Sequence, residues 1–135
     1  MAYWLFKSEP GAWSWDQQVK DGKQGTEWTG VRNFAARNHM RAMRKGDLGF
    51  FYHTGEEKRI VGVVEVVKQA HPDSTGGEWE CVDIAAVKPV PRPVTLEAIK
   101  AENKLAAMAL VRLARLSVQP VADAEWKLVS KMAGL

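Results

Sequence analysis

One short segment combines an aromatic ring, a pliable backbone and positive charge. Trp28-Thr29-Gly30-Val31-Arg32-Asn33 is followed by a helical stretch carrying Arg37, Arg41 and Arg44. From this tryptophan to Gly46 there are five Lys or Arg and no Asp or Glu. An aromatic ring can stack on a flat base, and neighbouring cations can hold its phosphates. The segment therefore predicts a nucleic-acid site.

The same segment also has the pattern of a helix start, and this alternative remains open. In that interpretation Asn33 is the N-cap and Trp28 packs on the helix. In the nucleic-acid interpretation Trp28 stacks on the base, and Gly30 lets backbone groups approach its edge. Thr29 and Asn33 then supply hydrogen-bond donors and acceptors.

Polar residues also stand at the ends of two predicted strands. Lys7-Ser8-Glu9-Pro10 ends the first strand, so Lys7 could meet a phosphate and Ser8 a base edge, although a plain Ser-Pro turn fits better. His53 ends another strand and could act as an acid or base. A lone histidine at a strand end is more often a hydrogen-bonding surface residue.

A third polar set leads into the last predicted strand. Arg115, Ser117 and Gln119 alternate, which places three polar side chains on one strand face. A charged run is usually a solvated face, but this alternation is unusual for a strand face that packs in the core.

Catalytic and metal-binding motifs find little support. His39 and His71 lack metal-ligand spacing with each other or with Cys81, so we expect no metal site. The chain has no phosphate-binding loop, Gly-x-Gly-x-x-Gly motif or Ser/His/Asp spacing. We therefore expect no cofactor.

Composition favours one ordinary globular domain spanning residues 1–135. Of these residues 46% are apolar and 26% charged, and the net charge of +3 is too small for a general nucleic-acid coat. A single cysteine rules out an intramolecular disulfide, and no run has the length of a signal or transmembrane segment. We expect a cytoplasmic protein that does not bind membranes.

Periodicity and turn residues predict the elements that position these groups. We expect strands at 3–7, 48–53, 60–67, 79–88 and 116–121, and helices at 14–20, 33–46, 95–103, 105–110 and from 123. The proline-rich stretch 89–93 should end regular structure. Because the strands are not separated by regular crossover helices, the pattern favours a strongly bent mixed sheet or small barrel with helices outside.

Several motifs, taken together and in order, resemble a known family. They are Lys7-Ser8-Glu9-Pro10, Trp28-Thr29-Gly30-Val31-Arg32-Asn33, Gly46-Asp47 with Phe50-Phe51-Tyr52-His53, Val61-Gly62-Val63 and Arg115-Leu116-Ser117-Val118-Gln119-Pro120-Val121. The set closely resembles the EVE domain, the family of the thymocyte nuclear protein, over residues 2–132.

The resemblance implies an α+β, PUA-like fold: a bent mixed β-barrel with helices packed around it. It also implies kinship with YTH domains, which read methylated adenine in RNA. By this resemblance the chain is a non-enzymatic binder of DNA or RNA that bears a modified base, such as methylated or hydroxymethylated cytosine. The base would be flipped into an aromatic-walled pocket.

The resemblance also assigns roles to particular positions. Lys7 and Ser8 match a strand-end pair beside the YTH pocket, and Trp28 matches its first cage tryptophan. Thr29 follows the place where a main-chain carbonyl accepts a hydrogen bond from the base, and Arg115 falls near a phosphate-gripping residue. Two positions differ from the YTH pattern. Glu9 replaces a common Asn, which favours a donor such as the cytosine amino group. The second cage tryptophan is missing, so Met108 or Leu110 would form a softer wall.

The expected site has two parts. The base-binding set is Ser8, Trp28, Thr29, Gly30, Asn33, Phe51, His53, Met108 and Ser117, and the phosphate-binding set is Lys7, Arg32, Arg37, Arg41 and Arg115. Two alternatives stay open. One is a hydrolase of modified nucleosides or RNA that uses Ser8, Glu9 and His53. The other is an adaptor whose exposed Trp and Met residues bind a protein.

Overall fold

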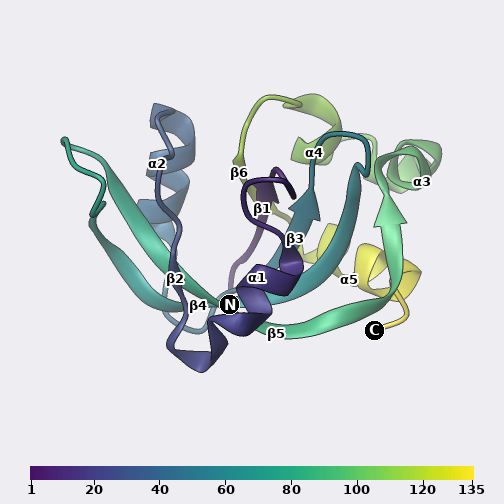
Figure 1. Cartoon of the computed structure of the whole chain (residues 1–135). Helices are drawn as coiled ribbons and strands as arrows, with labels where there is room; N and C mark the ends of the chain where they lie inside the picture. The colour runs from purple at the N-terminus through teal and green to yellow at the C-terminus, as the bar shows by residue number, and fades with distance from the viewer.

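The computed structural model describes residues 1–135 as a mixed α+β fold built on one six-stranded sheet (Figure 1). The strands are β1 (Tyr3–Ser8), β2 (Thr26–Glu27), β3 (Leu48–His53), β4 (Arg59–Pro72), β5 (Glu80–Thr95) and β6 (Val118–Val121). The helices are α1 (Trp15–Lys20), α2 (Phe34–Ala42), α3 (Leu96–Ala101), α4 (Ala109–Arg112) and α5 (Asp123–Met132), with 3₁₀ turns at Gly22–Gln24 and Asn103–Leu105.

The sheet is strongly bent but open, so it is the bent mixed sheet that the sequence pattern allows and does not close into a barrel. Its strand order is β2-β5-β4-β3-β1-β6, which leaves β2 and β6 as unpaired edges. β1 and β3 run parallel, and every other pair is antiparallel. The long strands β4 and β5 cross the whole molecule, from the hairpin tip beside α2 to the region of α3 (Figure 1).

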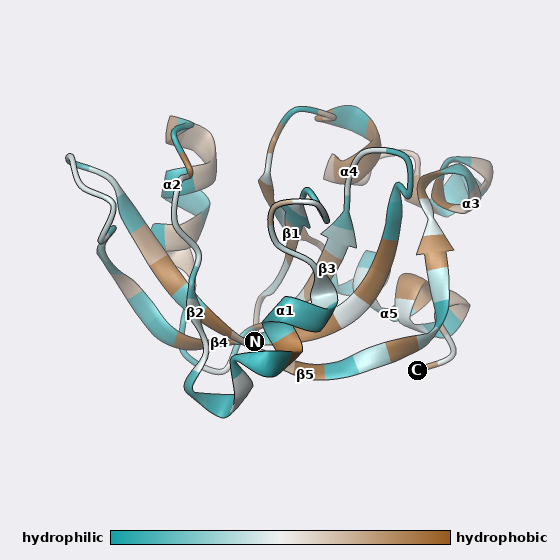
Figure 2. Cartoon of the chain, in the orientation of Figure 1, coloured by the Kyte–Doolittle hydropathy of each residue, from teal (hydrophilic) through white to brown (hydrophobic).

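Each face of the sheet carries its own apolar core, because side chains alternate along every strand. On β3, Phe51 belongs to a cluster with residues of α1 and α2, whereas Phe50 belongs to a cluster with residues of α3, α4 and α5. Hydrophobic residues accordingly recur along β4 and β5 in Figure 2. On α2, Ala36 and Met40 are fully buried in the first of these clusters.

Strand β5 is longer than the sequence predicts, because it continues through Pro89, Pro91 and Pro93 to Thr95. Beyond Ile84 it pairs with β4 on one side only, since β2 consists of Thr26–Glu27 alone. Proline lacks an N–H and is tolerated on an edge strand whose free side needs no donor. The expectation that these prolines end regular structure was therefore wrong.

Helix α2 is shorter than predicted, because the backbone turns before Gly46. Met43 is extended, and Asp47 Oδ2 accepts hydrogen bonds from Arg44 N–H and Trp4 Nε1–H, each at 3.0 Å. The buried carboxylate thus builds a turn that the helical period does not reveal. No helix in the structure is both long enough and apolar enough to cross a membrane.

Candidate functional site

A cavity of about 540 Å³ lies between the end of β1 and strand β2 with the loop that follows it. This volume is within the range of pockets that hold small organic ligands. Its lining consists of Lys7, Ser8, Glu9, Ala12, Trp13, Thr26, Glu27, Trp28, Thr29, Gly30, Val31, Arg32 and Ser117.

The cavity occupies the opening of the sheet. Thr26 and Glu27 form edge strand β2, and Ser117 directly precedes edge strand β6. Ser8 is the last residue of β1, the neighbour of β6. The lining residues therefore come from both sides of the gap that separates the two unpaired edges.

Trp28 forms an aromatic part of the lining and is held rigidly from behind. Its N–H donates to the carbonyl of Val82 at 2.8 Å, which extends the β2–β5 pairing by one residue. Its ring meets those of Phe6 and Phe51 edge-on, with centroids 5.6 and 5.7 Å apart. Only 8% of the residue is exposed. Such edge-on contacts fix the plane of an aromatic ring.

A buried carboxylate fixes the loop that follows Trp28. Asp73 accepts hydrogen bonds from Gly30 N–H at 3.0 Å and from Arg32 Nη1 at 3.3 Å. Burial alone would raise the pKa of Asp73, but bonds from Thr75, Gly30 and Arg32 outweigh it and lower the pKa to about 2. Gly30 adopts φ +81°, a conformation that side chains disfavour, so its place in this turn suits glycine.

Lys7, Ser8 and Ser117 line the cavity together at the end of β1. Lys7 Nζ donates to the carbonyl of Ala114 at 2.6 Å, and partial burial lowers the pKa of Lys7. Ser8 Oγ donates to the carbonyl of Trp13. A cation and two hydroxyl groups thus lie on one side of the cavity.

Trp13 is a lining residue that the sequence analysis missed. Its Nε1–H donates to Oε1 of Gln18 at 2.9 Å, and Gln18 itself is fully buried. Gln18 Nε2 donates in turn to the carbonyl of Ile84 at 3.1 Å. One feature of the sequence could have indicated this residue. Trp13 directly precedes Ser14, the N-cap of α1, and so lies close to the turn that follows Ser8.

Four residues of the expected base-binding set lie outside the cavity lining. Phe51 is fully buried behind Trp28, and Met108 is buried in the cluster on the opposite face of the sheet. Asn33 uses Oδ1 to cap α2 through Ala36 N–H at 2.9 Å. These placements correct the expectation that the side chains of Phe51, Met108 and Asn33 form the walls of this cavity.

His53 is the fourth of these residues, and its partners are structural. Nε2 accepts Trp15 N–H at 3.0 Å, so Nδ1 carries the proton and donates to Glu57 Oε1 at 2.9 Å. The His53 hydrogen bond is the main interaction that lowers the pKa of Glu57. Ser8 and His53 are neighbours across β1 and β3, but Ser8 Oγ donates to Trp13 and Glu9 accepts a bond from Thr54, so the three residues of the hydrolase alternative are not hydrogen-bonded to one another.

The expected phosphate-binding residues divide into two groups. Lys7 and Arg32 line the cavity. Arg37 lies 4.8 Å from the ring centre of Phe34 and leaves its buried Nε without a hydrogen-bond partner. Arg41 forms an ion pair with Glu80, and Arg115 is exposed on the loop before Ser117.

Comparison with solved structures gives the same fold over the whole chain. A protein of Agrobacterium tumefaciens is 54% identical, has a TM-score of 0.98 and is matched over 100% of this chain and 94% of its own. The human THYN1 protein, solved in complex with DNA containing 5-methylcytosine, is 31% identical with a TM-score of 0.91, covering 100% of this chain and 99% of that chain.

Three further comparisons extend this picture. The YTH domain of the Zygosaccharomyces rouxii MRB1 protein has a TM-score of 0.59 at 14% identity, over 98% of this chain and 86% of its own, which confirms the expected likeness in fold. Mouse thymocyte nuclear protein 1 is 34% identical over 94% of this chain and 71% of its own length. The EVE domain profile matches residues 2–132. This chain therefore belongs to the EVE domain family.

Proposed function

We propose that this chain binds nucleic acid bearing a modified base, which leaves its stack and enters the cavity beside Trp28. The observation that carries the proposal is a cavity at the open edge of the sheet, lined by Trp28 and Trp13 and by the cations Lys7 and Arg32. Flipping a base costs a few kcal/mol, and stacking on an aromatic ring returns about 1–3 kcal/mol. The THYN1 complex with methylated DNA, from a relative of the same fold, supports it.

Modified cytosine is the base that the lining fits best. Glu9 lines the cavity with a carboxylate, an acceptor suited to the N4 amino group of cytosine. Ala12 and Val31 add apolar surface that would receive a methyl group without leaving a polar atom unpaired. Trp13 takes the place that the sequence analysis gave to Met108, that of a second wall.

Lys7, Arg32 and Arg115 would contact the phosphates that flank the flipped base. Lys7 and Arg32 are at the cavity, and Arg115 is exposed two residues before Ser117. Three cations are enough to contact the phosphates beside one base, but too few to neutralise a long stretch of duplex. We propose no catalytic step, because the lining does not contain His53.

The test is fluorescence anisotropy with a labelled duplex that carries one 5-methylcytosine, against the same duplex unmodified. We expect tighter binding of the methylated duplex and a loss of about 5- to 150-fold in Trp28→Ala, equivalent to about 1–3 kcal/mol of stacking. Ser117→Phe, which fills the cavity from another segment, should also abolish the preference. Single-stranded RNA with N6-methyladenosine tests the other class of base.

Trp126→Phe is the matched control, because Trp126 is a tryptophan of the other core cluster. Its binding should equal that of the original chain. Circular dichroism establishes that each variant is folded. Folded Trp28→Ala and Ser117→Phe variants that bind with undiminished affinity and preference would refute the proposal.

The adaptor alternative rests on a separate feature, the stacked rings of Phe34 and Trp79. Their centroids are 5.0 Å apart, and Phe34 is 64% exposed. Binding to nucleic acid should weaken steeply with salt, whereas an apolar protein contact should not. A salt titration of any captured complex therefore separates the two functions.

A further inference from the structure

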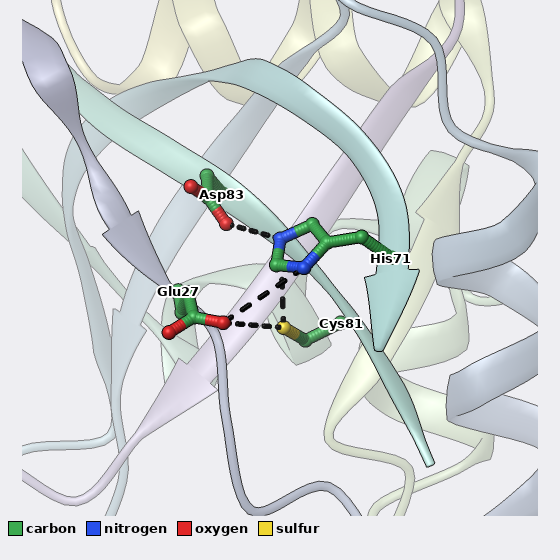
Figure 3. Close-up of side chains that lie close together, drawn as sticks. All are labelled: Glu27, His71, Cys81 and Asp83. Atoms are coloured by element: carbon green, nitrogen blue, oxygen red, sulfur yellow. Dashed lines mark hydrogen bonds and ion pairs between the residues drawn. The ribbon is translucent and has the colours of Figure 1, made fainter. Parts of the chain in front are cut away.

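Four potential metal ligands from three strands converge beside the cavity. Glu27 comes from β2, His71 from β4, and Cys81 and Asp83 from β5 (Figure 3). The sheet register explains their meeting, because His71 pairs with Cys81 and Glu27 pairs with Asp83. The spacings of the histidines and the cysteine along the chain gave no sign of a metal site. The pairing of strands brings the two carboxylates to them.

The four ligand atoms lie close enough together to share one ion after small movements of the side chains. All four atoms lie within 4.8 Å of one another. Cys81 Sγ is 3.8 Å from Glu27 Oε1 and 3.9 Å from His71 Nε2. Tetrahedral zinc with bonds of about 2.0–2.3 Å separates its ligands by about 3.4–3.6 Å. These two separations need to shorten by only a few tenths of an ångström.

The orientation of His71 is the second observation. Its Nδ1 lies 3.0 Å from the carbonyl oxygen of Pro72, so Nδ1–H donates to it, and Nε2 turns toward Asp83 Oδ1 at 2.6 Å. A carbonyl that holds the remote N–H is the usual support of a metal-bound histidine. The 2.6 Å contact is a hydrogen bond with a proton between the two atoms, and binding of a tetrahedral zinc ion would replace that proton and move the atoms apart to about 3.3 Å.

The burial of the four side chains suits an ion that enters from one side. Cys81 is fully buried, whereas the side chains of His71 and Asp83 are 18% and 19% exposed and that of Glu27 is 35% exposed. No lysine or arginine forms an ion pair with either carboxylate. A divalent cation would supply the missing charge.

We propose that Glu27, His71, Cys81 and Asp83 form a binding site for a divalent transition metal, with zinc as the matching ion. One sulfur, one imidazole nitrogen and two carboxylate oxygens are ligands that zinc accepts in tetrahedral geometry. The ion would join β2 to β4 and β5, and so fix the residue that precedes Trp28. The proposal stands independently of nucleic-acid binding.

Cobalt(II) substitution tests the site, because cobalt reports which atoms bind it. The untagged full chain is stripped with a chelator and titrated with Co²⁺, and zinc is then added in competition. We expect one equivalent of Co²⁺, visible d–d bands of tetrahedral intensity and a near-ultraviolet thiolate-to-cobalt absorption. Zinc should displace the cobalt and abolish all of these bands.

Variants assign the ligands. Cys81→Ser should remove the thiolate absorption, and His71→Asn should lower Co²⁺ affinity by at least about 100-fold, beyond the 10- to 100-fold typical of outer-shell changes. His39→Asn, a partly buried histidine outside the cluster, is the matched control and should bind normally. Glu27→Gln, at a partly exposed position, provides a ligand variant that is expected to fold.

The contrary results are equally specific. A folded original chain that shows no thiolate absorption at excess Co²⁺ would overturn the proposal. So would cobalt binding that remains equally tight in folded Glu27→Gln and His71→Asn. In either case a proton on His71, and not a metal, accounts for its contact with Asp83.

Discussion

Phe51 stands edge-on to Trp28, with ring centroids 5.7 Å apart and planes inclined by 78°. Phe51 is fully buried, so it contacts the rear of the tryptophan and not the cavity. Phe51, which the sequence analysis expected to contact the base, therefore orients the ring of Trp28, and Trp28 lines the cavity.

Phe51→Leu should lower the free energy of unfolding by about 1–2 kcal/mol, because it removes buried aromatic contacts but keeps an apolar side chain. Nucleic-acid affinity should fall less than in Trp28→Ala. Urea unfolding and anisotropy measure the two effects. If Phe51→Leu were as stable as the original chain yet bound more weakly than Trp28→Ala, its ring would be a direct contact of the base.

Asp73→Asn should destabilise the domain by about 2 kcal/mol at neutral pH, the equivalent of the lowering of its pKa from 3.8 to about 2. The folded-state pKa is the lower one, so this stability is present above about pH 4 and is lost as the pH falls toward 2. The difference between the two proteins should shrink over that window. Urea midpoints at pH 7 and pH 3 test it, and an equal difference at both values would contradict it.

Lys7→Met should reduce the slope of log affinity against log salt by about 0.7–0.9, because one cation no longer neutralises a phosphate. Burial lowers the pKa of Lys7 below its usual 10.5, so its contribution should disappear, as pH rises, before that of ordinary lysines. Lys104→Met, at an exposed position on a 3₁₀ turn, is the control. An unchanged slope in Lys7→Met would assign this lysine a structural role through Ala114.

Gly62→Ala should destabilise the domain by about 1–3 kcal/mol, because a Cβ there would lie 2.4 Å from ring atoms of Trp15. Displacement of Trp15 would also disturb α1, which positions Gln18 and through it Trp13. Gly11→Ala is the control, since its nearest neighbour would lie at 3.9 Å. Thermal denaturation of both variants measures the effect, and equal midpoints would show that Trp15 moves aside freely.

Local sequence signals predicted the elements better than they predicted the site. The helix starts at Ser14 and Asn33 follow from short-range capping rules, and the structure confirms them. The length of β5 did not follow, because the tolerance of Pro89 depends on where β2 stops.

The site residues that the sequence missed depend on long-range pairing. Trp13 reaches the cavity through a buried glutamine that also bonds Ile84 of β5. Met108 was expected to form a wall of the cavity, but it lies in the apolar core on the opposite face of the sheet. No spacing rule connects Glu27 with His71, because only the strand register brings them together.

The two unpaired edges of the sheet affect which ligands this fold can accommodate. A closed barrel has a diameter set by its strand number and stagger, so a wider ligand would require a different pairing of the strands. Here β2 and β6 share no hydrogen-bond ladder, and the residues between them belong to short connecting segments. Selectivity for one ligand over another can therefore evolve by substitution of a few residues between these edges, while the central strands keep their pairing and both apolar cores keep their packing.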